Sequence, residues 1–152
     1  MTLRIAVLTG GGDCPGLNSA VKWVTKTALD PKLAEKRDTT FEVLGVMDGW
    51  KGLLDVDPGK PESRRKHLKA LNEEIVRTWD RYGGTNLGTS RTNPFSTRHD
   101  RSETLLRNIR DLGIDVVVAI GGEDTLGVAY RLHHLGVRTI GIPKTIDNDL
   151  AG

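Results

Sequence analysis

A lysine, a threonine and two aspartates lie close together near the end of this sequence, in the stretch Lys144-Thr145-Ile146-Asp147-Asn148-Asp149. An apolar run at residues 137–142 comes just before them and predicts a strand. Ligands bind outside the carboxyl ends of strands in open α/β sheets, which is where this stretch would lie. A carboxylate there could accept a hydroxyl proton while the lysine offsets phosphate charge. The residues therefore predict phosphoryl transfer, although an Asx-rich turn would use the same short polar side chains.

Three consecutive glycines form a second candidate site near the start of the sequence. Gly10, Gly11 and Gly12 follow the apolar run 3–8, and a helical pattern begins at Leu17. Amides at a glycine turn before a helix can bind a phosphate. The spacing matches neither a Walker A loop nor a GxGxxG motif, so a plain glycine turn explains the pattern equally well.

Acidic residues follow a further glycine turn. Gly121 and Gly122 come after the apolar run 114–120 and lead into Glu123 and Asp124. Phosphate-bound magnesium typically takes one or two carboxylates, so these acids could hold a metal. The alternative is that they only complement the dipole of a helix that starts here. If the strands are parallel, this turn, the first glycine turn and the lysine–aspartate stretch converge at one sheet edge.

Alternating strand and helix patterns predict an α/β fold, a three-layer Rossmann-like domain with a mostly parallel sheet. Helical patterns are expected at residues 17–28, 68–79, 102–112 and 123–135, with Ser102 as a cap and Gly83-Gly84 as a stop. Strands are expected at residues 3–8, 41–47, 114–120 and 137–142, with a turn at 48–52 after the second of them. Residues 30–40 suggest a surface connection, and residues 56–66 lead into the helical pattern at 68–79.

Composition narrows the class of protein. The 152 residues suit one domain, and a net charge of +2 gives no argument for a nucleic-acid partner. Cys14 is the only cysteine, which favours a reducing compartment, and no run is long enough for a membrane span or a signal peptide. We therefore expect a cytoplasmic protein without a membrane or nucleic-acid partner. The four histidines show no metal-ligand spacing, and no nucleophile triad is present.

Five motifs, taken together and in this order, resemble the 6-phosphofructokinase family. They are GGDCPGLN at 11–18, DGWKGL at 48–53, GGT with LGTSR at 83–91, GGEDT at 121–125, and TIDND at 145–149. The resemblance implies phosphorylation of fructose 6-phosphate at its 1-hydroxyl, with Mg²⁺ as cofactor. Asp147 matches the proton acceptor for that hydroxyl, and Thr145, Ile146 and Asp149 match neighbours that contact substrate or organise the site.

The resemblance also implies roles on the donor side. Gly12 matches the glycine whose backbone contacts the donor phosphates, and Arg91 matches an arginine near the transferring phosphoryl group. By itself, an arginine in this position would be an ordinary surface residue. Glu123 stands where most members carry a metal-binding aspartate. Its side chain is one methylene longer, so the carboxylate is retained with a different reach.

Asp124 and Lys144 bear on the phosphoryl donor. Members that use ATP typically have glycine at both positions, whereas members that use diphosphate have Asp and Lys, as here. A carboxylate at Asp124 would fill the space for a nucleoside and repel the α-phosphate, while Lys144 would offer positive charge to the leaving phosphate. We read the donor as diphosphate. ATP as donor, or a catalytically silent phosphate-binding module, are the alternatives.

Family members are roughly twice as long and draw their sugar-phosphate site from residues further along the chain. The resemblance therefore implies that residues 1–152 are an N-terminal donor-binding α/β domain, a fragment without the C-terminal half. We expect no turnover from this segment alone. In full length, the family usually assembles homodimers or homotetramers.

Overall fold

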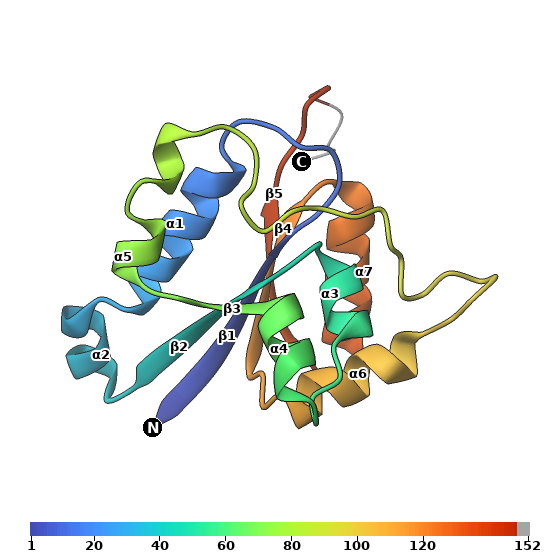
Figure 1. Cartoon of the computed structure of the whole chain (residues 1–152), viewed down its shortest axis with the longest axis horizontal. Coiled ribbons are helices and arrows are strands. Elements are labelled where there is room, and N and C mark those ends of the chain that lie inside the picture. The colour runs from blue at the N-terminus through green and yellow to red at the C-terminus, as the bar shows by residue number, and fades with distance from the viewer. Residues whose placement is uncertain (149–152) are drawn as a thin grey trace.

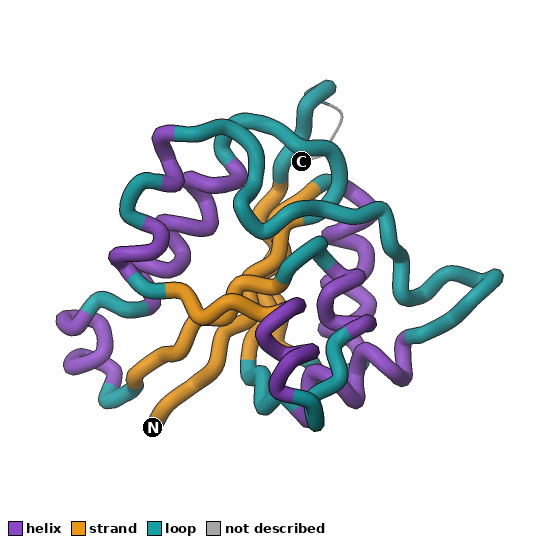
Figure 2. Tube along the Cα trace, in the orientation of Figure 1, coloured by secondary structure: helices purple, strands orange, loops and turns teal. Residues whose placement is uncertain are grey.

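A five-stranded sheet lies between two layers of helices (Figures 1 and 2). This computed structural model describes residues 1–148. The strands are β1 (Thr2–Thr9), β2 (Thr40–Val46), β3 (Leu68–Leu71), β4 (Val116–Gly121) and β5 (Arg138–Pro143). The helices are α1 (Leu17–Ala28), α2 (Pro31–Arg37), α3 (Trp50–Asp55), α4 (Pro61–His67), α5 (Glu73–Val76), the 3₁₀ helix η1 (Trp79–Arg81), α6 (Ser102–Asp111) and α7 (Glu123–His134).

The sheet has the order β3-β2-β1-β4-β5, and β3 is its antiparallel member. β1 pairs in parallel with β2 on one side and β4 on the other, with Val7 opposite Gly45 and Val118. The chain thus winds outward from β1 in both directions. A crevice opens at the carboxyl ends of β1 and β4, where the winding reverses. The predicted α/β class and mostly parallel sheet are confirmed.

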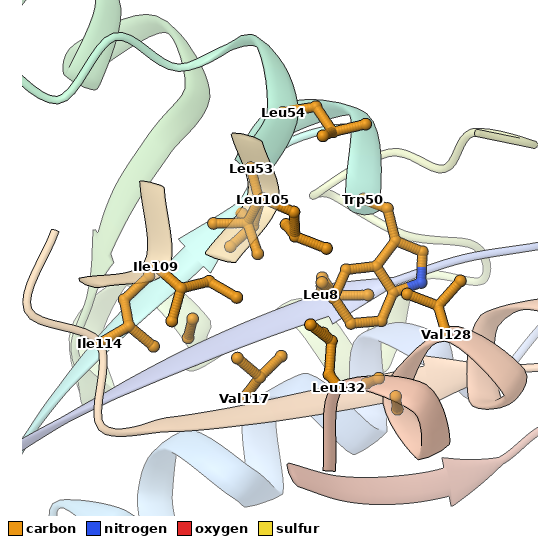
Figure 3. Packing of buried hydrophobic residues seen from close by; sticks show 14 of the residues in the cluster. Leu8, Trp50, Leu53, Leu54, Leu105, Ile109, Ile114, Val117, Val128 and Leu132 are labelled. Carbon is orange, nitrogen blue, oxygen red and sulfur yellow. The ribbon is translucent and has the colours of Figure 1, made fainter. Parts of the chain in front are cut away.

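Residues of β1 alternate between two hydrophobic clusters. Ala6 and Leu8 pack with residues of α3, α6 and α7 in the cluster drawn in Figure 3. Ile5 and Val7 face the other side, where they pack with residues of α1 and α5. Because side chains alternate along a strand, β1 must be apolar on both faces. Fully burying one such Leu or Val contributes about 1.5–3 kcal/mol.

β5 is less covered than the other parallel strands. Within residues 1–148 it pairs with β4 alone, and Ile140 at its centre is 54% exposed. The strand expected from residues 137–142 is present, and most of its residues are exposed. Among the described residues, no helix is long and apolar enough to cross a membrane.

The prediction of one helix over residues 68–79 is wrong. Leu68–Leu71 form β3, whose Leu71 lies opposite Val43 of β2, and two short helices follow. The side chain of Asn72 accepts a hydrogen bond from the amide of Ile75 and starts α5. Apolar residues three and four apart fit a helix, but pairing with the free edge of β2 decides the structure here. Gly83-Gly84 consequently end no helix; they lie in a connection without helix or strand.

Further expectations about local structure are corrected. The supposed surface connection 30–40 contains α2, and residues 56–66, which were expected only to lead into a helix, contain the start of α4. Each of these helices begins at a proline, Pro31 or Pro61. Proline suits the first helical position because the amide it lacks has no partner there. Residues 50–52 continue into α3 rather than forming a turn. Ser102 is not a cap: its amide donates to Asp100, whose side chain starts α6.

His67 gives the fold a predicted pH dependence. Burial, and secondarily the charge of Lys66, holds the pKa of His67 below its usual 6.5. The unfolded chain then takes up a proton more readily, so the free energy of unfolding should fall as the pH drops below 6.5. Urea titrations of the full-length protein at about pH 7.5 and about pH 5.5 measure this difference. His67→Gln should reduce it, whereas His134→Gln, at an exposed position, should not.

Candidate functional site

A pocket of about 410 Å³ lies at the carboxyl ends of β1, β4 and β5. Almost every residue singled out from the sequence contributes to it. Gly10 and Gly121 do not line it, and Asp149 lies outside the described residues. The lining residues are Gly11, Gly12, Arg91, Gly122, Glu123, Asp124, Thr125, Lys144, Thr145, Ile146 and Asp147. The predicted convergence of three turns at one sheet edge is therefore confirmed.

The ends of β1 and β4 approach α7 closely because glycines stand there. A Cβ atom on Gly10 would collide with Thr125, and one on Gly121 would lie 2.7 Å from the Thr125 Cβ. The amide of Gly10 also donates to Ile120, at 2.9 Å. Thr125 itself is 4% exposed and was given no role from the sequence. The one sequence signal for this contact was the glycine where each strand ends, because glycine allows a neighbour to approach the backbone closely.

Lys144 bridges two sides of the pocket. Its amide donates to Gly121 at 2.9 Å, which continues the pairing of β5 with β4. Its Nζ donates to the carbonyl of Gly12 at 2.6 Å. Gly11 has a φ of +78°, and a Cβ there would lie 3.5 Å from Lys144 Nζ. The ammonium group thus lies against the glycine turn, where a bound phosphate would meet both.

The helix end that faces the pocket belongs to α7, not α1. α1 begins at Leu17, five residues after the last glycine of the turn, and the amide of Asn18 already donates to Gly84. In contrast, Glu123, Asp124 and Thr125 form the first turn of α7 and line the pocket. The expected start of α1 at Leu17 is confirmed, but the start of this helix does not line the pocket. Phosphate contacts in the pocket would come from the turn itself and from the start of α7.

Arg91 reaches the pocket from a segment distant in the sequence. It belongs to residues 82–101, which connect η1 to α6 without helix or strand and cross the carboxyl edge of the sheet (Figures 1 and 2). The guanidinium and the ammonium of Lys144 are the two cationic groups lining the pocket. Connections this long in compact domains are commonly functional.

The charge of the lining favours a polyanion together with a cation. Two cationic side chains face three carboxylates, those of Glu123, Asp124 and Asp147. These carboxylates are exposed, so solvent or a ligand reaches them. Within residues 1–148, no group of three or more His, Cys, Asp or Glu side chains could hold a metal ion. A metal here would need oxygens from a phosphate ligand, which is the usual arrangement for Mg²⁺.

Comparisons with known proteins find similar sequences. The sequence matches the family model of phosphofructokinase over residues 4–152. It is 45% identical over 148 residues to the pyrophosphate–fructose 6-phosphate 1-phosphotransferase of Dictyoglomus thermophilum, covering 97% of this chain and 37% of that protein. It is 42% identical over 149 residues to ATP-dependent 6-phosphofructokinase 3 of Streptomyces coelicolor, covering 98% of this chain and 38% of that protein.

A solved structure shows the same fold. The chain superposes on the T-state crystal structure of Pichia pastoris phosphofructokinase with a TM-score of 0.80 at 27% identity, covering 100% of this chain and 17% of that one. The chain therefore spans less than two fifths of these curated relatives and a smaller part of the yeast enzyme.

Proposed function

Since the chain belongs to the phosphofructokinase family, we propose that its full-length protein transfers a phosphoryl group from diphosphate to fructose 6-phosphate. The product would be fructose 1,6-bisphosphate, the reaction being a reversible step of glycolysis. One observation carries the proposal: Asp124 and Lys144, the residues that suit diphosphate, line the same pocket as Gly12 and Asp147. The enzyme would thus be a diphosphate–fructose-6-phosphate 1-phosphotransferase.

Asp147 is the proposed catalytic base. Its carboxylate takes the proton of the 1-hydroxyl as that oxygen forms a bond to the terminal phosphorus of diphosphate. The bond from this phosphorus to the bridging oxygen breaks, and inorganic phosphate leaves with the electron pair. Thr145 and Ile146 line the pocket beside Asp147 and would contact the sugar phosphate, as would Asp149. In the reverse direction the protonated Asp147 returns its proton.

Arg91 and Lys144 are the proposed stabilisers of charge on the donor. Arg91 would lie near the transferring phosphoryl group, and Lys144 near the leaving phosphate, so both offset charge that develops in the transition state. The amides of Gly11 and Gly12 add contacts to phosphate oxygens. Asp124 would repel the α-phosphate of ATP and fill the space of its nucleoside, which selects the smaller donor.

Mg²⁺ is the proposed cofactor, and the lining fits it. Glu123 would hold the ion together with oxygens of the diphosphate, because residues 1–148 supply too few ligands for a cage of their own. The pocket lining has more carboxylates than cationic side chains, and this excess of negative charge also favours a bound cation. When bound, Mg²⁺ supplies positive charge that neutralises the phosphate oxygens.

The rest of the enzyme enters this proposal as well. Residues 1–152 would be the N-terminal donor-binding domain, and the sugar-phosphate site would draw on the larger part of the relatives that this chain does not span. We further propose that the protein is cytoplasmic, which its single cysteine supports. The family resemblance supports a homodimer or homotetramer.

The second candidate is the same reaction with ATP as donor. The ATP-dependent relative from Streptomyces coelicolor supports it, being nearly as similar as the diphosphate-dependent relative named above. A silent phosphate-binding module is the third candidate. It is disfavoured because Asp147, Lys144 and Arg91 line one pocket, which a module without turnover has no need to preserve.

A donor comparison in the full-length protein tests the proposal. Initial rates of fructose 6-phosphate phosphorylation are measured with diphosphate and with ATP, each with Mg²⁺. Diphosphate should give the higher kcat/KM, and chelation of Mg²⁺ should abolish turnover. A higher kcat/KM with ATP would favour the second candidate, and no turnover with either donor would favour the third.

A further inference from the structure

Two buried polar residues outside the pocket hold the segment that carries Arg91. Thr9, the last residue of β1, is 0% exposed, and Asn18 in the first turn of α1 is 1% exposed. Neither lines the pocket. Both make their side-chain hydrogen bonds to residues 82–88, just ahead of Arg91. Buried polar groups are costly unless they are paired, so these bonds fix where the segment lies.

Asn18 holds the first part of this segment. Its Nδ2 donates to the carbonyls of Tyr82 and Gly83 at 3.2 and 3.4 Å, and its Oδ1 accepts from the amide of Asn86 at 2.7 Å. The backbone of Asn18 adds a bond to Gly84 at 3.0 Å. Every polar atom of this side chain is thus used on the segment.

Thr9 holds the part nearer to Arg91, through a chain of bonds whose directions can be assigned. The Gly88 carbonyl, 2.8 Å from Thr9 Oγ1, can only accept, so the Thr9 hydroxyl donates to it. Thr85 Oγ1, at 2.7 Å, must then donate to Thr9, while it accepts from the amide of Leu87 at 3.1 Å. One hydroxyl at the end of β1 therefore fixes both ends of the turn 85–88.

Packing leaves the segment little room to move. The side chain of Leu87 is fully buried, and its carbonyl accepts from the amide of Asp48 at 2.7 Å. Gly88 has a φ of +73°, and a Cβ there would lie 2.6 Å from Asp48 Oδ1. Arg91 follows only three residues later, so a shift of Gly88 would carry over to its guanidinium.

From these contacts we infer that Thr9 is a positioning residue for Arg91. Its hydroxyl sets where the guanidinium lies relative to Lys144 and Gly12, without touching any ligand itself. The inference rests on the proposed function, because it assigns Arg91 a place beside the transferring phosphoryl group. A misplacement of about 1 Å can cost about 10²-fold in rate, so a single lost hydroxyl far from the chemistry has a measurable effect.

The test uses Thr9→Val in the full-length protein, which removes the hydroxyl and nearly keeps the volume. With diphosphate as donor, kcat and kcat/KM should fall together by about 10²-fold, because Arg91 acts in the transition state. Thr9→Ser, which keeps the hydroxyl, should restore most of the rate. Amide hydrogen exchange over residues 83–91 should be faster in Thr9→Val than in wild type.

Thr25→Val is the matched control. Thr25 is also 0% exposed, and its hydroxyl donates to a backbone carbonyl, that of Val21, at 2.8 Å. It should lower stability and leave kcat unchanged. If Thr9→Val does not fold, Thr85→Val takes its place. Thr85 is half-buried and carries the other hydroxyl in the same chain of bonds, so its replacement should give the same loss of kcat.

Two results would overturn the inference. One is a wild-type kcat in Thr9→Val, or in Thr85→Val where Thr9→Val does not fold. The other is an equal loss of kcat in Thr25→Val. Failure of the proposed function looks different, because wild type would then turn over neither donor. The hydrogen-exchange comparison would still decide whether the Thr9 hydroxyl holds residues 83–91: unchanged exchange would contradict it.

Discussion

Replacing Asp147 with asparagine should lower kcat for fructose 6-phosphate phosphorylation by about 10²–10⁴-fold in the full-length protein. Asparagine keeps the size of the side chain, but its amide cannot take the proton of the 1-hydroxyl. Binding of the donor should change little, because Gly12, Arg91 and Lys144 remain in place around the pocket. Steady-state kinetics with diphosphate, measured in both directions, provide the check, since the same carboxyl group serves the reverse reaction.

Asp111→Asn is the matched control for this prediction. Asp111 is an exposed aspartate at the end of α6 and does not line the pocket. The same change of charge there should leave kcat at the wild-type value. An Asp147→Asn variant with undiminished kcat would remove this residue from the mechanism.

The donor preference should shift when Asp124 and Lys144 are both replaced by glycine. The loss of the Lys144 ammonium should lower kcat with diphosphate by about 10²–10³-fold, the usual loss for one group that stabilises developing charge. Removal of the Asp124 carboxylate opens space at the start of α7 and takes away a repulsion against the α-phosphate. The value of kcat/KM with ATP should therefore rise, and each single variant should show part of the effect.

Lys36→Gly combined with Asp38→Gly provides a control with the same changes of residue type. Both positions are exposed, at the end of α2 and just after it, and neither lines the pocket. This variant should keep the wild-type ratio of kcat/KM for the two donors. If ATP use in the Asp124→Gly, Lys144→Gly variant stays unchanged, the donor reading is wrong and the ATP-dependent alternative gains support.

Long-range order was predictable where strands are mostly apolar. Residues 3–8 suggested a buried strand and residues 114–120 a strand covered on both faces, and β1 and β4 pair with each other inside the sheet. The start of α1 near Leu17 and the apolar face of α6 followed from helical spacing in the same way. Such patterns are reliable because burial on a given face depends only on the period of the element.

Predictions of local structure failed where tertiary contacts compete with the preference that the spacing of apolar residues gives. Residues 68–71 have apolar positions that suit a helix, yet they pair as β3 with an edge of the sheet that only the folded protein offers. Ser102 was expected to cap α6, but the side chain of Asp100, two positions earlier, accepts the amide hydrogen bond instead. Neither choice can be made from the residues alone, because both alternatives satisfy the local rules.

By itself, the sequence determined which chemical groups are available: a carboxylate, a lysine and two glycine turns that follow apolar runs, and an arginine in a Gly-rich stretch. Strand period and glycine content suffice for that, because both are local properties. Only the tertiary structure decided how the groups meet. Lys144 Nζ lies against Gly12 across the pocket, and Arg91 arrives on a segment held by Thr9 and Asn18. Hydrogen bonds between residues so distant in sequence depend on the folded sheet, which brings their backbones within reach.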